Sequence, residues 1–231
     1  MEQLKKELSE GYLETGEYFS KAFEVLKKII RKEAVLIIGI SILYFASGAF
    51  NILMPNLPLD LLIGTIGGAF SLLLIRKIAF FIDPAQEIEN SSIKLIILAI
   101  IFSVPITGIV FLIVFFIFPY FITSYVIEKM TLNELYNHNL KITSGNRGRI
   151  FLPIIILIFI SYMCFHMCSF ILNFLPIMPE VKLVILCILI GISVLFSNTM
   201  MTIVYLNVKY IRTENQDYKN RNENDDLKKI E

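Results

Sequence analysis

A long uncharged segment occupies the middle of this 231-residue sequence. No Asp, Glu, Lys or Arg lies between Lys94 and Glu128, and most residues in between are Ile, Leu, Val or Phe. Such a segment cannot form a water-facing surface, because apolar side chains are driven out of water. It is also long for a single bilayer crossing, which takes about 20 residues. The sequence therefore predicts a membrane protein whose topology depends on whether this segment crosses once or twice.

The composition of the whole chain supports the same class. The sequence is 56% hydrophobic, whereas soluble domains are roughly 45–50% apolar. The formal net charge of +1 gives no reason to expect nucleic acid as a partner. All three cysteines lie inside apolar blocks, which argues against a disulfide framework. The first thirty residues have no early apolar core, so a cleaved signal peptide is not expected.

The distribution of lysine and arginine predicts which segments share one side of the membrane. Basic residues gather in residues 1–32, 128–149 and 207–231. Because positively charged loops stay in the cytoplasm, these segments and both termini are expected on the cytoplasmic side. An even number of crossings must then lie within residues 93–127, which we expect to form a hairpin of two short helices. Its turn is expected at residues 105–108, where proline and glycine interrupt the apolar run.

The predicted fold class is an all-α integral membrane bundle of six transmembrane helices. We expect an amphipathic interfacial helix in residues 1–32, a membrane domain over residues 33–208 and a disordered tail over residues 209–231. A cytoplasmic surface helix should begin at the capping box Thr131–Glu134. Abundant isoleucine, lysine and asparagine are typical of an AT-rich bacterial genome, so we expect the bacterial cytoplasmic membrane as the location. The six spans are expected at residues 33–54, 59–82, 93–105, 108–127, 150–175 and 181–208.

Small and polar residues recur on single faces of the predicted spans, at spacings of three and four. In lipid such faces suit contact between helices, because small residues let backbones approach closely. A GxxxG pair in the second span is one example. The residues predicted to lie in helix contacts or in the polar interior are Ser41, Tyr44, Gly48, Asn51, Gly64, Gly68, Asn173 and Asn198.

Three arginines are candidates for contact with a substrate or with lipid headgroups. Arg76 lies toward the end of the second span, and two interpretations remain open for it. It could snorkel to the interface, or it could face an anionic substrate from inside the bundle. Arg147 and Arg149 follow the surface helix and are expected at the headgroups.

One cluster suggests metal chemistry. Cys164, His166 and Cys168 combine soft sulfur with imidazole, a set that suits Cu(I) or zinc. However, two cysteines on one helix supply only two ligands, and no second Cys/His group is present. Cysteine is also an ordinary packing residue. We therefore predict no metal site and no cofactor, with these three residues kept as the candidates.

The sequence contains no recognisable catalytic set. Apart from Glu33 and Asp60 at their ends, the predicted spans contain no Asp or Glu, and no Walker, GxSxG or HExxH motif occurs. His138, in the predicted surface helix, is expected on a solvated face. No catalytic residue is therefore predicted, and the chain is not expected to be an enzyme.

Three groups of residues together resemble a known family. They are Phe118-Pro119-Tyr120 with Glu128; Asn133-Glu134-Leu135 with Asn139, Ile142, Thr143, Gly145, Asn146 and Arg149; and Val204-Tyr205-Leu206 with Lys209 and Arg212. Over residues 19–214 the pattern resembles a broad bacterial group of membrane proteins. That group includes the membrane domain attached to some glycerophosphodiester phosphodiesterases, and related stand-alone proteins of unknown function.

The resemblance implies a six-helix bundle with both ends in the cytoplasm. It does not imply phosphodiesterase activity, because the soluble catalytic domain is not present here. The chain departs from the family at two places: the family usually has serine at Asn139, and a Pro-Gly turn at Thr107-Gly108.

Three functions fit these observations, in the following order. The first is a non-enzymatic bundle that acts as a scaffold, docks partner membrane proteins or organises lipid. The second is a transporter or permease component, for which a broken helix at residues 105–108 with Arg76 could form the site and an ATP-binding subunit could be the partner. The third is an enzyme acting on lipid headgroups.

The two-crossing interpretation predicts the outcome of cysteine labelling. In a cysteine-free background, a cysteine at Thr107 should react with a membrane-impermeant reagent from outside the cell. A cysteine at Ser144 should react only after the membrane is opened, because residues 128–149 are expected in the cytoplasm. Labelling of Ser144→Cys on intact cells would contradict the hairpin.

Overall fold

The computed structural model describes residues 2–53, 57–85, 88, 91–103, 120–145 and 147–227, with only the backbone described at residues 44, 47–53, 57–60, 102–103 and 213–227. Within these ranges the regular structure is entirely α-helical. The β-type contact present is a single antiparallel bridge between Ile88 and Glu128. The predicted all-α class is confirmed.

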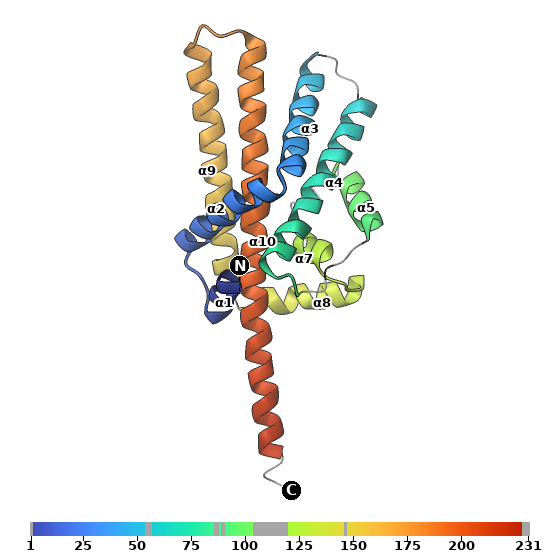
Figure 1. Cartoon of the computed structure of the whole chain (residues 1–231), viewed down its shortest axis with the longest axis vertical. Helices are drawn as coiled ribbons and strands as arrows, with labels where there is room; N and C mark the ends of the chain where they lie inside the picture. The colour runs from blue at the N-terminus through green and yellow to red at the C-terminus, as the bar shows by residue number, and fades with distance from the viewer. Residues whose placement is uncertain are drawn as a thin grey trace.

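The helices form upright rods that stand on a smaller cluster of short helices. In chain order they are α1 (Glu2–Glu10), α2 (Thr15–Lys32), α3 (Ala34–Leu53), α4 (Leu57–Ile82), α5 (Ser92–Ser103), α7 (Phe121–Ile127), α8 (Leu132–Thr143), α9 (Arg147–Phe174) and α10 (Pro179–Leu227). Figure 1 shows α3, α4, α9 and α10 rising together, with α5 beside α4 and α2 crossing in front. We call the end where α1, α7 and α8 gather around α10 the base.

Three helices are long and apolar enough to cross a membrane. In the part of the chain that the structure describes, the candidate spans are Leu61–Ile82, Arg147–Phe174 and Pro179–Arg212. Two shorter apolar segments, Ala34–Leu43 and Ser92–Ile101, accompany them. Three spans are fewer than the six predicted. The predicted turn at 105–108, and most of the predicted helix at 108–127, lie outside the described residues.

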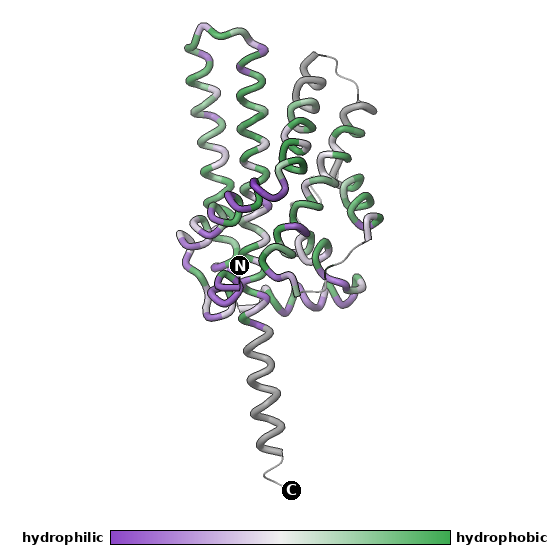
Figure 2. Tube along the Cα trace, viewed as in Figure 1, coloured by the Kyte–Doolittle hydropathy of each residue, from purple (hydrophilic) through white to green (hydrophobic). Residues whose placement is uncertain are grey.

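Helix α10 is the axis of the bundle. It contacts α1, α2, α3, α4, α7, α8 and α9. Residues 203–208 of α10 are buried one after another, and a helix that is buried on every face must be surrounded by other elements. Above this point the upright helices are predominantly apolar, whereas α1, α2 and α8 are largely hydrophilic (Figure 2).

The predicted amphipathic N-terminal segment consists of two helices, α1 and α2. A capping box formed by Glu14 and Glu17 starts α2, which satisfies backbone donors at the helix end. One face of α2, including Tyr18 and Val25, is buried against the bundle. The side chain of Phe23 is 66% exposed, so a second apolar strip of α2 remains available to lipid.

The surface helix forms where the sequence predicts it. The Thr131 hydroxyl accepts a hydrogen bond from the Glu134 backbone N–H, and the Glu134 carboxylate accepts one from the Thr131 N–H. The helix α8 is followed by Gly145 with φ of 77°, a left-handed conformation that favours glycine. The predicted capping box is confirmed.

The tail differs from the prediction. Residues from Lys209 onward were expected to be disordered because they are polar and charged, but α10 continues to Leu227. No glycine or proline occurs after Gly191, and adding residues to an existing helix needs no new nucleation. The apolar part of α10 therefore nucleates a helix that the polar tail extends.

Asn207 joins α10 to the N-terminal helices. Its Nδ2 donates to the carbonyls of Leu8 (2.7 Å) and Gly11 (2.9 Å). Its Oδ1 accepts from the Tyr18 hydroxyl at 2.5 Å and from the Leu13 N–H at 3.4 Å. One fully buried carboxamide thus uses all its hydrogen-bonding capacity to hold the loop between α1 and α2.

Replacing Asn207 with leucine should destabilise the protein. The change keeps the branched shape of the side chain but leaves buried donors and acceptors unpaired, at a cost of about 3 kcal/mol in the free energy of unfolding. Thermal unfolding in detergent, followed by circular dichroism, should show a lower midpoint. Asn137→Leu is the matched control, because Asn137 is exposed on α8. Equal midpoints for the two variants would contradict the role of Asn207.

Candidate functional site

A buried ion pair lies at the centre of the base. The Glu128 carboxylate accepts a hydrogen bond from the Tyr205 hydroxyl (2.6 Å) and from the Lys209 ammonium (2.7 Å), both at Oε1. Glu128 ends α7, whereas its two partners lie one turn apart on α10. Hydrogen bonds to an ionised group are about twice as strong as neutral ones. This carboxylate therefore fixes the position of α7 on α10.

The surface helix joins the same network through His138. Its Nε2 lies 3.2 Å from the Tyr205 hydroxyl oxygen. Because the single Tyr205 proton goes to Glu128, Nε2 must carry the hydrogen and donate it. His138 is half-buried rather than solvated as predicted, since the face of α8 that carries it packs on α10. Burial, with Lys209 and Lys141 as smaller contributions, lowers the pKa of His138, and Glu128 opposes the shift.

A second contact fastens α8 to α7. The Asn139 Nδ2 donates to the Ser124 hydroxyl (2.8 Å) and to the Leu135 carbonyl (2.9 Å). The Ser124 hydroxyl in turn donates to the Tyr120 carbonyl at 2.7 Å. Both side chains are fully buried. Asn139, where the resembling family usually has serine, thus bridges two helices.

Further ionic contacts tie the end of α4 to its neighbours. The Asp83 carboxylate accepts from the Tyr210 hydroxyl at 3.1 Å and pairs with Lys5 at 2.8 Å. The Arg76 Nε donates to the Val126 carbonyl and its Nη2 to the Ser91 carbonyl, both at 2.9 Å. These contacts anchor α10, α1 and α7 to α4.

The carboxylate and the tyrosine at the centre of the base are buried. Glu128 and Tyr205 form an acid–base pair that could exchange a proton, but they are 6% and 0% exposed. A general acid or base must reach a substrate within hydrogen-bond distance. The arrangement of Glu128 and Tyr205 therefore indicates a structural role.

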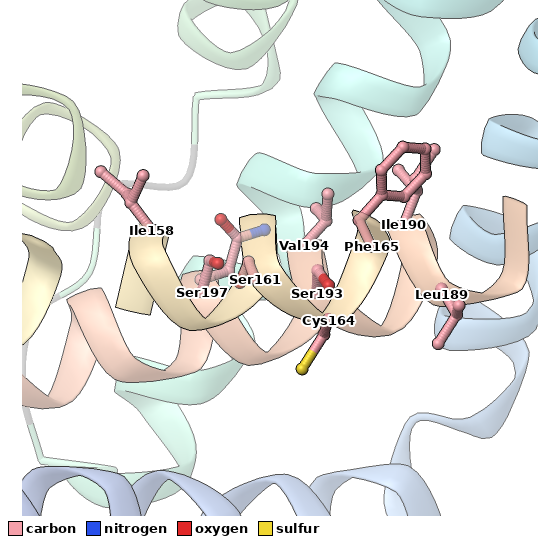
Figure 3. A pocket seen from close by; sticks show the side chains of 10 residues that line it. Ile158, Ser161, Cys164, Phe165, Leu189, Ile190, Ser193, Val194 and Ser197 are labelled. Carbon is pink, nitrogen blue, oxygen red and sulfur yellow. The ribbon is translucent and has the colours of Figure 1, made fainter. Parts of the chain in front are cut away.

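A groove between α9 and α10 has a different character. It encloses about 420 Å³ and is partly open to the side. Figure 3 shows its lining side chains coming from the two helices. Ser161, Ser193, Ser197 and Asn198 supply hydroxyl and carboxamide groups, and Phe165 and Leu189 lie toward the apolar end. No hydrogen bond between described residues uses the three serine hydroxyls, so these groups are available to a ligand.

The residues predicted to pack helices fall into four groups. Gly68 lies against Ala99 of α5, with 3.5 Å from an added Cβ to the Ala99 Cβ, and Ser41 lies close to Gly191 of α10. Asn198 lines the groove and approaches the Ser71 carbonyl at 3.5 Å. Gly64 is half-buried in α4, while Asn173 is exposed near the end of α9. Only the backbone is described at Tyr44, Gly48 and Asn51.

The predicted arginines and metal candidates lie apart from one another. Arg149 lies 4.9 Å from the Tyr12 ring centre at the start of α9, and Arg147 is exposed beside it. His166 stacks on Tyr162 with ring centres 4.2 Å apart. Across the described residues, no three His, Cys, Asp or Glu side chains lie close enough to hold a metal ion. The structure does not bring Cys164, His166 and Cys168 together as a ligand set.

Comparison of the chain with protein-family models, with curated proteins and with solved structures finds no match. The family resemblance described above therefore stays a prediction.

The stability of the base should depend on pH through His138. Its folded-state pKa is depressed, so the unfolded chain binds a proton more readily and stability falls as pH falls through the ordinary value of 6.5. We expect the thermal midpoint in detergent to decrease between about pH 7.5 and about pH 5.5. His138→Gln, which removes this titration, should flatten the decrease.

The chain has two histidines, so His166→Gln is the matched control and should keep the decrease. An unchanged pH dependence in His138→Gln would show that another group is responsible.

Proposed function

We propose that the chain is a non-enzymatic polytopic membrane protein that docks a transmembrane helix of a partner protein in the groove between α9 and α10. The observation that carries the proposal is the polar lining of that groove within two candidate spans. The base provides a rigid support, and the groove provides the binding surface.

The depth of the groove supports this role. Ser161 lies at the middle of the Arg147–Phe174 span, and Asn198 lies near the middle of Pro179–Arg212. Water cannot satisfy polar groups at that depth, so hydroxyl and amide side chains there favour contact with another helix. An unpaired polar group in an apolar medium costs free energy. A docked helix with small or hydroxyl-bearing residues would lower that cost.

The partner is proposed to be a different protein rather than a second copy. Helix pairs in membranes need small residues at the contact. In this chain Gly67 and Gly68 already face Leu43 and Ala99. The outward side of α9 instead presents large residues such as Phe159 and Phe170, which are 63% and 64% exposed. That surface suits lipid better than a matching groove.

The proposal takes the chain to cross the bacterial cytoplasmic membrane six times, with both termini in the cytoplasm. Helices α1 and α8 lie at the base, and the polar part of α10 projects from it (Figure 1), as segments on one side of a membrane would. Their basic residues support the cytoplasmic side. The resemblance to the bacterial membrane-domain group points to the same arrangement.

Transport and headgroup chemistry rank below docking. The Arg76 guanidinium donates to two backbone carbonyls, which supports a role in packing over one in substrate binding. The pair formed by Glu128 and Tyr205 is buried, which likewise favours a structural role. No specific observation favours either alternative.

Site-specific photocrosslinking in native membranes tests the docking proposal. A photoreactive residue at Ile190, inside the groove, should form a discrete crosslink to a transmembrane segment of another membrane protein. The same residue at Phe159, on the lipid-facing side of α9, should form none. Ser193→Leu with Ser197→Leu should reduce the Ile190 crosslink at least about tenfold by filling the groove.

Ser169→Leu is the control, because Ser169 is half-buried on α9 but does not line the groove. Crosslinks to a second copy, crosslinks to lipid alone, or equal yields at Ile190 and Phe159 would each contradict the proposal.

A further inference from the structure

A second cavity lies where α2 turns into α3, beside the last turns of α4. It encloses about 480 Å³ and is lined by both charged groups and aromatic rings. The charged residues are Lys32, Glu33 and Lys77. Phe80 and Phe81 form the aromatic side, and Phe80 is 54% exposed. The cavity is separate from the α9–α10 groove and shares no lining residue with it.

The two lysines in this cavity are held differently. Lys77 forms an ion pair with Glu33 at 3.3 Å. The Lys32 ammonium lies 4.5 Å from the centre of the Phe81 ring, and no described carboxylate lies within ion-pair distance of it. A cation over an aromatic ring is positioned without being neutralised. Two positive charges against one negative charge leave the cavity with a net charge of +1.

The position of the cavity indicates which kind of anion would bind there. Helix α2 is amphipathic and joins directly to the apolar helix α3, so their junction belongs at the membrane interface. Basic pockets between helices on the cytoplasmic side of membranes bind phosphorylated lipid headgroups. The exposed Phe80 ring offers an apolar contact to the attached acyl chain.

We propose that this cavity binds the phosphodiester of an anionic phospholipid, with Lys32 and Lys77 contacting the phosphate and Phe80 contacting the lipid chain. Glu33 then limits the affinity, because it competes with the phosphate for Lys77. Occupancy would hold the α2–α3 junction against α4.

Native mass spectrometry of the purified full-length protein, released from phosphatidylcholine bilayers containing phosphatidylglycerol, tests this assignment. Each lysine near an anionic headgroup is worth about a fivefold change in affinity. Lys32→Gln with Lys77→Gln should therefore weaken phosphatidylglycerol retention about thirtyfold, and either single change about fivefold. Glu33→Gln should strengthen retention, since it frees Lys77.

The matched control is Lys27→Gln with Lys28→Gln. This control removes two positive charges, as the Lys32/Lys77 variant does. Both of its lysines are exposed on α2, and neither lines the cavity. Control retention should match that of the unaltered protein. Loss of retention equal to that of the Lys32/Lys77 variant would show a diffuse charge effect and overturn the proposal.

Two further results would also overturn it: unchanged retention in the Lys32/Lys77 variant, or displacement of the lipid by an equal concentration of inorganic phosphate. The second would assign the cavity to a free anion. If the double variant does not fold, Glu33→Gln decides the matter, because weaker or unchanged retention in that variant contradicts the arrangement.

Discussion

The buried carboxylate of Glu128 sets the conditions for the rest of the structure. An ionised carboxylate away from water is strongly unfavourable unless donors surround it. Here Tyr205 and Lys209 of α10 supply those donors, and His138 of α8 donates to Tyr205 in turn. Helix α7 therefore cannot leave α10 without losing the hydrogen bonds that Tyr205 and Lys209 donate to Glu128, and α8 cannot leave without losing the contact between His138 and Tyr205. The same logic applies to Asp83 with Tyr210 and to Asn207 with Tyr18, which fix α4 and α2 on the same axis.

The polar groups of the molecule are thus divided between two different environments. At the base, donors and acceptors meet one another across helices, and the network rigidifies the packing. In the groove between α9 and α10, the hydroxyls of Ser161, Ser193 and Ser197 meet no such partner among the described residues. The polar groups of the base are therefore used within the molecule, whereas the groove hydroxyls have hydrogen-bonding capacity left for a ligand.

Local sequence signals predicted the local structure well. The apolar blocks of the sequence fall on α3, α4, α5, α9 and the first part of α10, and the Thr131–Glu134 capping box located the start of α8. The membrane class also followed from composition, whereas the full set of six spans goes beyond the three that the structure describes. The composition of the tail predicts disorder, whereas α10 continues through these residues to Leu227.

The network at the base could not be predicted in the same way. The hydrogen bond from Tyr205 to Glu128 joins residues 77 apart in sequence, and that from Asn207 to Leu8 joins residues 199 apart. No periodicity relates such pairs, because only the packing of α10 brings them together. Tyr205, Glu128 and Asn139 did occur among the residues that carry the family resemblance, which was the one available signal. The groove serines could not be predicted as a site, because in the sequence they are only isolated polar residues within apolar blocks.

The continuity of α10 has a mechanical consequence. The helix passes without a glycine or proline from Ser193 in the groove, through its clamped section at Tyr205–Lys209, to Leu227. A rod without a hinge, held near its centre, behaves as a lever with the clamp as its fulcrum. A small tilt of its upper arm, such as insertion of a second helix beside Ser193 would produce, must swing the lower arm in the opposite direction. The last 15 residues to Leu227 extend about 22 Å, so that displacement would grow with distance from the clamp and reach its maximum at the end of α10.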